Sequence, residues 1–268
     1  MSAQTTEPSP PNGTSPRRAT AIVLARAGSK GVPGKNTAPV AGWPCIAWTI
    51  AAAQRGATRV VVSTDDPDAA RIAMMMRAEV VQRPGELADD RATIDDAARH
   101  AARAIEEQAG RLLDEPIVIL YANVPVRPDD LIARAIDRLT ATGCDSVQSY
   151  CRVGKHHPWW TARVDEETGA VRAWEGPLLN HGVYRRQDLP PAFVPDGGVI
   201  ALTRAALMLG VPGVEPGPHA FFGRDRRGIE TGPGEVIDID APIDLVVADA
   251  VLRRRLAGGM NASGGFAA

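Results

Sequence analysis

The stretch AIVLARAGSKGVPGKN, residues 21–36, decides the fold of this chain. It opens with a continuous apolar run from Ala21 to Ala25, which is typical of a strand buried on both faces of a parallel sheet. A loop rich in glycine and cations follows directly. Its glycines are Gly28, Gly31 and Gly34, and its cations are Arg26, Lys30 and Lys35. Glycines let a backbone approach a ligand closely and cations attract negative charge, so the stretch predicts a strand followed by a polyanion site. The alternative is a solvated basic surface loop.

The spacing of these glycines excludes the two best-known phosphate loops. A Walker loop needs Gly-x-x-x-x-Gly-Lys and then Ser or Thr, because the hydroxyl binds magnesium. Here Gly28 and Gly34 are one residue too far apart, and Asn36 stands where the hydroxyl would be. A dinucleotide loop needs Gly-x-Gly-x-x-Gly without a lysine cluster. The loop therefore predicts triphosphate binding, by charge and backbone, on a different nucleotide-binding fold.

Composition limits the partners that we expect. The 268 residues, 44% of them hydrophobic, can bury one large core with an insertion. A net charge of -2 creates no global field, so we expect neither nucleic acid nor a membrane as a partner. The three cysteines, Cys45, Cys144 and Cys151, lack metal-type spacing, and no apolar signal segment or bilayer-length run is visible. We therefore expect a reducing, cytoplasmic setting.

Strands and helices alternate outward from the opening stretch. We expect strands at 59–63, 79–81, 116–121, 145–150, 198–203 and 220–222, and helices at 44–54, 69–77, 93–110, 128–139 and 242–256. This alternation predicts a doubly wound, Rossmann-like α/β fold with a mostly parallel sheet and ligands at the carboxyl ends of its strands.

The regular alternation of strands and helices stops between residues 151 and 198. Large aromatic residues gather there, at Trp159, Trp160, Trp174 and Tyr184. An exposed apolar segment of this kind predicts an inserted β arm that covers the site or a partner subunit, and hence a homodimer. We expect residues 1–18 to be a disordered tail, 19–257 to be one domain that includes the arm, and 258–268 to be a flexible tail.

Two carboxylates near the carboxyl end of the chain form a candidate metal site. In residues 236–240, VIDID, alternation puts Asp238 and Asp240 on one face and the isoleucines on the other. Magnesium prefers one or two carboxylates together with phosphate oxygens, so we expect Mg²⁺ at this pair. The alternative is that Asp240 only caps the following helix while Asp238 is solvated.

The ordered motifs resemble those of the CMP-sialic acid synthetases, the acylneuraminate cytidylyltransferases. They are ARAGSKGVPGKN, VVVSTDD, RPGELADDRAT, YANVPVRP, HHP, RRQDLP and DIDAPIDL, and they cover roughly residues 19–256. The resemblance implies a nucleotidyltransferase that moves CMP from CTP to the anomeric hydroxyl of a nine-carbon α-keto acid sugar. Magnesium would assist and pyrophosphate would leave.

The resemblance also implies roles for individual residues. Catalysis would use Arg26, Lys35 and Asp240. Nucleotide binding would use Arg26, Ser29, Lys30, Lys35, Asn36, Arg83, Ala92 and Thr93, and metal binding Asp238 and Asp240. Fixed cations suit this chemistry, because a CTP triphosphate carries about four negative charges and more develops on the α-phosphate during attack. Either Asp240 or a water on the metal would accept the proton.

The motifs that the resemblance assigns to the sugar match the family less closely than those assigned to the nucleotide. The resemblance assigns the sugar to Tyr121, Asn123, Arg186, Asp196, Phe221 and Phe222. Tyr121 replaces a usual Gln, and Asp196 begins DGGVI where Asn-Gly-x-x-Tyr is usual. Arg186 would bind the sugar carboxylate, unless it forms a surface salt bridge. The two phenylalanines would be an apolar wall, unless they are core aromatics. The alternatives are therefore a cytidylyltransferase for Kdo or another acidic sugar, or a non-catalytic CTP-binding homologue.

Overall fold

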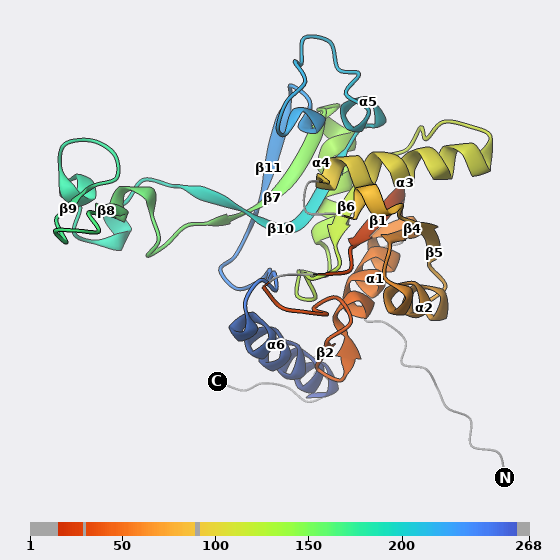
Figure 1. Ribbon diagram of the computed structural model, residues 1–268, viewed down its shortest axis with the longest axis horizontal. Coiled ribbons are helices and arrows are strands. Elements are labelled where there is room, and N and C mark those ends of the chain that lie inside the picture. The colour runs from red at the N-terminus through yellow and green to blue at the C-terminus, as the bar shows by residue number, and fades with distance from the viewer. Residues whose placement is uncertain (1–15, 29–30, 89–91, 262–268) are drawn as a thin grey trace.

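A computed structural model describes residues 16–28, 31–88 and 92–261. The described residues form a seven-stranded central sheet (Figure 1). Its strands, in spatial order, are β11 (Arg226–Thr231), β7 (Ser146–Arg152), β10 (Phe193–Leu202), β6 (Ile117–Tyr121), β1 (Arg17–Ala25), β4 (Ala57–Thr64) and β5 (Glu79–Gln82). No helix in these described ranges has the length and apolar character that a membrane span requires.

The sheet is mostly parallel and reverses its direction of growth at β1. Strand β1 pairs in parallel with β4 and with β6, and β4–β5 and β7–β11 are parallel as well. Strand β10 runs antiparallel to both of its neighbours, β6 and β7. The chain first builds outward from β1 through β4 to β5, and then crosses to β6 on the other side. Ligands bind such sheets at the carboxyl ends of the strands that flank this reversal.

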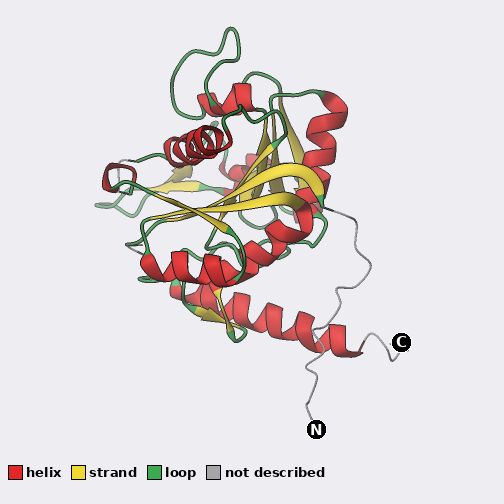
Figure 2. Cartoon of the chain, turned by 90° about the vertical axis from the view of Figure 1, so that its right-hand side faces the viewer, coloured by secondary structure: helices red, strands yellow, loops and turns green. Residues whose placement is uncertain are grey.

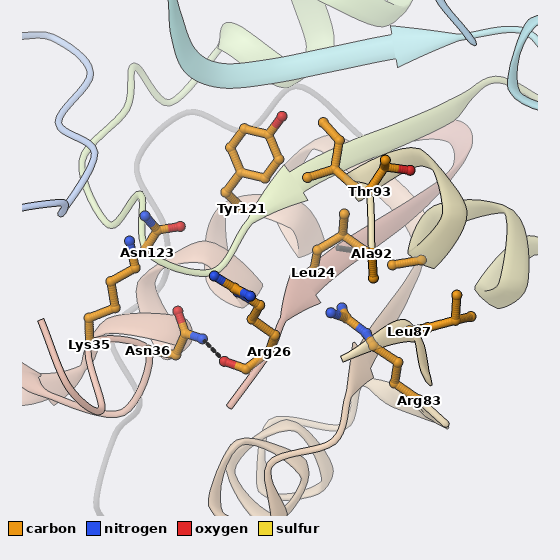
Figure 3. Close-up of a pocket in the computed structure, with 12 residues that line it drawn as sticks. Leu24, Arg26, Lys35, Asn36, Arg83, Leu87, Ala92, Thr93, Tyr121 and Asn123 are labelled. Carbon is orange, nitrogen blue, oxygen red and sulfur yellow. Dashed lines mark hydrogen bonds between the residues drawn. The ribbon is translucent and has the colours of Figure 1, made fainter. Parts of the chain in front are cut away.

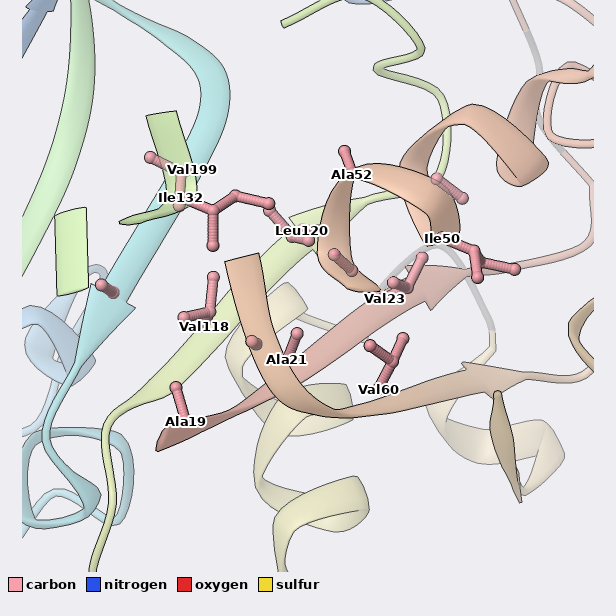
Figure 4. Packing of buried hydrophobic residues seen from close by; sticks show 14 of the residues in the cluster. Ala19, Ala21, Val23, Ile50, Ala52, Val60, Val118, Leu120, Ile132 and Val199 are labelled. Atoms are coloured by element: carbon pink, nitrogen blue, oxygen red, sulfur yellow. The ribbon is translucent and has the colours of Figure 1, made fainter. Parts of the chain in front are cut away.

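Helices cover both faces of the sheet, as the doubly wound prediction requires (Figure 2). Alternate residues of β1 divide the core: Ala21 and Val23 face one cluster, and Ile22 and Leu24 face the other. The first cluster, drawn in Figure 4, packs under α1 (Cys45–Gly56), α2 (Pro67–Met75) and α4 (Leu131–Thr142). The second packs under α3 (Ile94–Ala109) and α5 (Arg204–Leu207). The apolar run that opens the sequence is therefore buried from both sides.

A third, smaller cluster brings the carboxyl-terminal part of the chain beside the front loop. Helix α6 (Pro242–Asn261) lies against a hairpin of β2 (Pro39–Val40) and β3 (Trp43–Pro44) (Figure 1). Ala248 and Leu252 of α6 pack with Val40 of the hairpin, and Ile239 joins them with no exposed surface. This packing fixes the position of the acidic segment that precedes α6.

The inserted arm is a ribbon that leaves the sheet between β7 and β10 (Figure 1). A short hairpin of β8 (Ala162–Val164) and β9 (Val171–Ala173) lies at its tip. Apolar side chains of the arm are exposed, Trp174 by 57% and Tyr184 by 88%. The expected bounds of 151–198 are too wide, because β7 and β10 still pair at Arg152 and Phe193.

Several expected boundaries need correction. Strand β1 begins at Arg17, within the expected tail of residues 1–18, because Arg17 already pairs with Ala57 of β4. Its side chain adds a hydrogen bond from Nε to Asp137 Oδ1 at 2.8 Å. Residues 1–15 and 262–268 of the two expected tails lie outside the described ranges. Helix α6 continues to Asn261 and so includes the first residues of the expected second tail, 258–268. Residues 220–222 form a 3₁₀ turn, and the edge strand is β11 instead. Residues 236–240 are extended but join no sheet, making one bridge from Ile237 to Val126.

The contact between α1 and α4 predicts an effect on stability. A Cβ at Gly56 would lie 2.6 Å from the Ile132 Cβ, which cannot move without the helix backbone. We expect Gly56→Ala to lower the free energy of unfolding by about 1–3 kcal/mol through overpacking. Urea denaturation measures the change.

Gly258→Ala is the matched control, because Gly258 is also helical and a Cβ there would meet nothing within 4 Å. Alanine is a better helix former than glycine, so this variant should be as stable as wild type or more so. A Gly56→Ala protein that matches its control would contradict the packing described.

Candidate active site

Lys35 joins the front loop to the acidic segment across a sequence separation of 205 residues. Its ammonium Nζ donates to the Ile239 carbonyl at 2.7 Å and to Asp240 Oδ1 at 2.8 Å. The Lys35 side chain is only 15% exposed, whereas that of Asp240 is 75% exposed. The two motifs that the sequence analysis singled out at opposite ends of the chain therefore meet at one point.

The approach of the two segments requires a glycine in the front loop. A Cβ at Gly31 would lie 2.4 Å from the Asp240 carbonyl oxygen, closer than real contacts allow. The glycine spacing therefore serves packing of the loop against the acidic segment as well as access to a ligand. Ser29 and Lys30, which were expected to bind the triphosphate, lie outside the described residues.

The loop after β6 holds the acidic segment from the other side. The Asn123 side chain donates to Asp238 Oδ1 in a short hydrogen bond and to the Ile239 carbonyl at 3.2 Å. The backbone adds Ile239 N to the Asn123 carbonyl at 3.0 Å and Ile237 N to the Val126 carbonyl at 3.2 Å. Asn123 was expected to contact the sugar, but its amide group here positions Asp238.

The environment of Asp238 makes its carboxyl easier to protonate than a free one. Burial raises the pKa of Asp238 to about 6, and the nearby Asp240 carboxylate adds to this, while Lys35 opposes it. The expected alternation holds, because Ile239 is fully buried and Ile237 partly buried on the opposite face. Asp244 Oδ2 accepts from the Asp240 and Ala241 backbone N–H groups, at 3.0 and 2.7 Å, and so caps the start of α6.

The two aspartates provide ligands of the type that magnesium prefers. Hard divalent cations bind carboxylate oxygens, and magnesium keeps its remaining positions for water and phosphate. Space beside Asp238 depends on Gly197, where a Cβ would lie 3.4 Å from Asp238 Oδ2. The donor set and this cradle both fit a magnesium ion, which would be held by Asp238 and Asp240.

A pocket of about 280 Å³ opens at the carboxyl ends of β1 and β6 (Figure 3). It is lined by Leu24, Arg26, Lys35, Asn36, Arg83, Leu87, Ala92, Thr93, Ile94, Ala97, Tyr121 and Asn123. All of the expected nucleotide residues that the structure describes are among them. The volume is near the lower end of small-molecule sites, roughly 300–1,000 Å³.

Arg26 and Arg83 enter this pocket from the carboxyl ends of β1 and β5, the strands on either side of β4. Figure 3 shows the Arg26 side chain in the middle, with Asn36 and Asn123 on one side and Arg83 on the other. Asn36 Nδ2 donates to the Arg26 carbonyl at 2.9 Å and so fixes the loop after β1. Arg83 is 5% exposed, and its Nη2 donates to the Ser63 carbonyl at 2.9 Å. Burial lowers the pKa of this guanidinium, and Asp65 opposes the shift.

The amino end of α3 forms the opposite wall. Thr93 caps the helix: its hydroxyl accepts from the Asp96 N–H at 3.2 Å and donates to Asp96 Oδ2 at 2.7 Å. The Asp96 carboxylate also accepts from the Thr93 backbone N–H, so this is a capping box built with Asp. Ala92 and Thr93 therefore sit on a rigid element at the pocket edge.

Of the six residues expected to bind a sugar, Tyr121 and Asn123 line the pocket, and Asp196 lies on β10 next to Gly197. A Cβ at Gly197 would be 3.5 Å from the Tyr121 ring, so the ring packs against β10. The Asp196 carboxylate accepts from Ser149 Oγ, Thr231 Oγ1 and the Gly198 N–H. Asp196 thus ties β7, β10 and the end of β11 together behind the pocket.

The structure does not bring the other three sugar candidates to the pocket. Arg186 lies in the arm and lines a separate cavity of about 670 Å³ at its root, with Arg152 and Glu230. Phe221 and Phe222 are 1% and 7% exposed in the second core cluster. Ser146, at the first residue of β7, donates to the Phe222 carbonyl, so both rings lie near the amino-end edge of the sheet. The apolar-wall assignment is therefore corrected to core packing.

Sequence reasoning missed part of the pocket. Its apolar wall is Leu24, Leu87, Ile94 and Ala97. Leu24 could have been found, because it is the last alternate residue of a strand that ends at the site. The role of Gly197 could not, because its φ of +75° and its neighbours follow from tertiary contacts.

The fold and the pocket define a Rossmann-like α/β protein with a nucleotide-type site at the reversal of its sheet. The chain belongs to the cytidylyltransferase family, whose family model matches residues 20–157. The resemblance drawn from the motifs is thereby confirmed.

Individual relatives agree with this assignment. N-acylneuraminate cytidylyltransferase A of Danio rerio is 30% identical over 246 residues, which are 89% of this chain and 53% of that protein. CMP-N,N'-diacetyllegionaminic acid synthase of Legionella pneumophila is 27% identical over 240 residues, 88% of this chain and 96% of that protein. The chain thus spans about half the length of the Danio rerio relative.

A solved structure of CMP:2-keto-3-deoxy-manno-octonic acid synthetase complexed with CTP shares the fold. Its TM-score is 0.63 at 15% identity, and the match covers 89% of this chain and 100% of that one.

The buried position of Asp238 predicts a pH dependence of stability. Its folded pKa is raised from 3.8 to about 6, so the folded protein binds more protons than the unfolded chain between these values. The stability due to the protonated carboxyl is lost as pH rises through this window. In metal-free buffer, we expect the melting temperature of Asp238→Asn relative to wild type to rise from about pH 4 to about pH 7, because asparagine stays neutral.

Asp137→Asn is the control of opposite sign. The Arg17 hydrogen bond and charge lower the pKa of Asp137, so its contribution is present at neutral pH and lost on acidification. This variant should lose melting temperature, relative to wild type, as pH rises to the usual value of 3.8, and the difference should stay constant from about pH 4 to about pH 7. A difference between Asp238→Asn and wild type that stays constant over the same range would contradict the assignment.

Proposed function

We propose that this chain is a CTP-dependent cytidylyltransferase that activates an acidic α-keto sugar, giving a CMP-sugar and pyrophosphate. The observation that carries the proposal is the meeting of Lys35 with Asp240 at the mouth of the pocket. A cation for the triphosphate and carboxylates for its metal are both required by magnesium–nucleotide chemistry. Membership of the cytidylyltransferase family supports the same reading.

The reaction that we propose is an in-line displacement at the α-phosphorus of CTP. The anomeric oxygen forms a bond to the α-phosphorus, and the bond to the bridging β-phosphate oxygen breaks, so that pyrophosphate leaves. The hydroxyl proton would pass to the Asp240 carboxylate, which is 75% exposed, or to a water beside it. Cations that are fixed before the reaction stabilise the charge that develops on the phosphate oxygens.

Different residues of the pocket would bind different parts of the nucleotide. We propose that Arg26 and Lys35 bind the triphosphate, together with Ser29 and Lys30 of the same loop. Asn36, Arg83 and the Ala92–Thr93 turn would receive the cytosine and ribose, which the burial of Arg83 at 5% exposure supports. A magnesium ion held by Asp238 and Asp240 would supply a positive charge beside the phosphates.

The acceptor is proposed to be a nine-carbon sialic-acid-like sugar. The printed names of the relatives support this: the Danio rerio protein is an N-acylneuraminate cytidylyltransferase and the Legionella protein a CMP-legionaminic acid synthase. Tyr121, in place of the usual Gln at the pocket edge, favours a second candidate in which the acceptor is Kdo or another acidic sugar.

We also propose a homodimer that forms through the arm. Leu178 and Tyr184 are exposed by 58% and 88%, and exposed apolar surface of this kind is typical of subunit contacts. Arg186 would then reach a sugar only in an assembled site, because within one chain it lines the cavity at the root of the arm. The three free thiols favour a reducing, cytoplasmic setting.

A substrate panel tests the activity. With CTP, Mg²⁺ and N-acetylneuraminic acid, legionaminic acid or Kdo, we expect pyrophosphate release with at least one acid. Lys35→Met should lower kcat/KM by roughly 10²–10³, the loss typical of one fixed transition-state donor. Arg138→Met is the control, because Arg138 is exposed on α4 away from the pocket.

Turnover with Kdo alone would favour the second candidate. Binding of CTP by calorimetry without turnover across the panel would contradict the enzymatic proposal and favour a non-catalytic CTP-binding protein.

The arm predicts the oligomeric state. At micromolar concentration, light scattering should give the mass of a dimer for wild type and of a monomer for Leu178→Glu, because the new charge would be desolvated in the contact. Met75→Glu is the matched control, since Met75 is an apolar residue 74% exposed on α2. A monomeric wild-type protein would end the proposal.

A further inference from the structure

Arg127 carries a buried guanidinium that the proposed chemistry does not use. It is 3% exposed, and its Nε donates to the Gly198 carbonyl at 3.1 Å. Its Nη1 and Nη2 are buried and have no hydrogen-bond partner among the described residues. Burial lowers the pKa of Arg127 to about 10, so the group remains charged at neutral pH. A buried charge without a partner is costly, so its retention needs a reason.

This guanidinium lies near the segment that carries Asp238. The carbonyl of the adjacent Val126 accepts from Ile237 N at 3.2 Å, which places residue 127 next to the segment that carries Asp238. The carbonyl that Arg127 binds belongs to Gly198, and the neighbouring Gly197 is the residue whose Cβ would contact Asp238 Oδ2. Asp196 and Asp238 are the carboxylates whose charges oppose the effect of burial on Arg127.

The acidic pair therefore has two fixed cations near it. Lys35 bonds directly to Asp240 at 2.8 Å, and Arg127 is near enough to Asp238 for its charge to lower the pKa of that carboxyl. No group of three or more metal-type side chains gathers anywhere in the described part of the chain. A free divalent cation would thus find two carboxylates whose charge is already balanced. A cation that arrives on a triphosphate brings about four negative charges with it and meets much less repulsion.

We propose that Arg127 is a positioning residue that makes the acidic pair accept its divalent cation on a nucleotide and reject the free ion. Its charge acts on Asp238, the buried member of the pair, while its hydrogen bond to the Gly198 carbonyl holds the charge in place. The inference rests on the proposed function, because it assumes that these two carboxylates hold the metal of a nucleotide.

The test is titration with Mn²⁺ alone, followed by the paramagnetic resonance of the free ion. Wild type should bind Mn²⁺ weakly without nucleotide. Arg127→Met removes the charge and fills a similar volume, so it should bind Mn²⁺ on the order of tenfold more tightly or better. Arg127→Lys keeps the charge but loses the planar guanidinium, so its Mn²⁺ affinity should stay within about twofold of that of wild type even if its melting temperature falls. A purely structural arginine would affect both variants alike.

Two further measurements locate the effect and guard against unfolding. The double variant Arg127→Met with Asp238→Asn should lose the gained Mn²⁺ affinity, and thermal melting shows whether each variant is folded. If Arg127→Met does not fold, wild type alone decides. It should bind Mn²⁺ at least about tenfold more tightly with a non-hydrolysable CTP analogue than without it.

Three results would overturn the inference: equal Mn²⁺ affinity of wild type and a folded Arg127→Met, an equal gain in Arg127→Lys, or wild-type Mn²⁺ binding that is independent of the analogue. Pyrophosphate release by wild type separates this failure from that of the proposed function. Normal turnover with any of these results removes only the role of Arg127, whereas absence of turnover removes the function itself.

Discussion

The hydrogen bonds of the Lys35 ammonium to Ile239 and Asp240 are the interactions on which the site depends. They connect a loop at the end of β1 with a segment that belongs to no strand of the sheet. The third hydrophobic cluster supports this contact, because Ile239 and α6 pack against the β2–β3 hairpin. Asn123 fixes the same segment from the end of β6. The pocket therefore lies where two parallel strands, a glycine loop and a carboxyl-terminal segment all meet.

The groups around Asp238 shift the pKa of its carboxyl in opposite directions. Burial and the second carboxylate both favour protonation of Asp238, and Lys35 and Arg127 favour its charged form. A carboxylate must be deprotonated to bind a metal, so a cation at Asp238 competes with a proton more than it would at a free carboxyl. Two fixed cations beside two carboxylates also leave little net charge for a free ion. A nucleotide that carries its own metal resolves both conflicts, because its phosphates engage the cations while its metal engages the carboxylates.

The fold was largely predictable, because the apolar runs, the glycines and the helix caps are local signals. The meeting of Lys35 with Asp240 was predictable from chemistry alone, because a triphosphate site and the carboxylates of its magnesium must lie together. Other features were hidden. Arg17 and Arg18 look like tail residues, yet Asp137 and Asp114 pair with them at the start of β1. Phe221 and Phe222 resemble a ligand wall in sequence, but their burial depends on where the turn after α5 lies. The burial of Arg127 and the role of Asn123 arise from contacts over 71 and 115 residues, which no local pattern contains.

The most direct test of the central claim is anomalous diffraction from crystals of the protein grown with Mn²⁺ and CTP. The account predicts a manganese peak about 2 Å from carboxylate oxygens of Asp238 and Asp240, shared with phosphate oxygens that also contact Lys35. A peak remote from these aspartates, or a triphosphate bound away from the front loop, would contradict it.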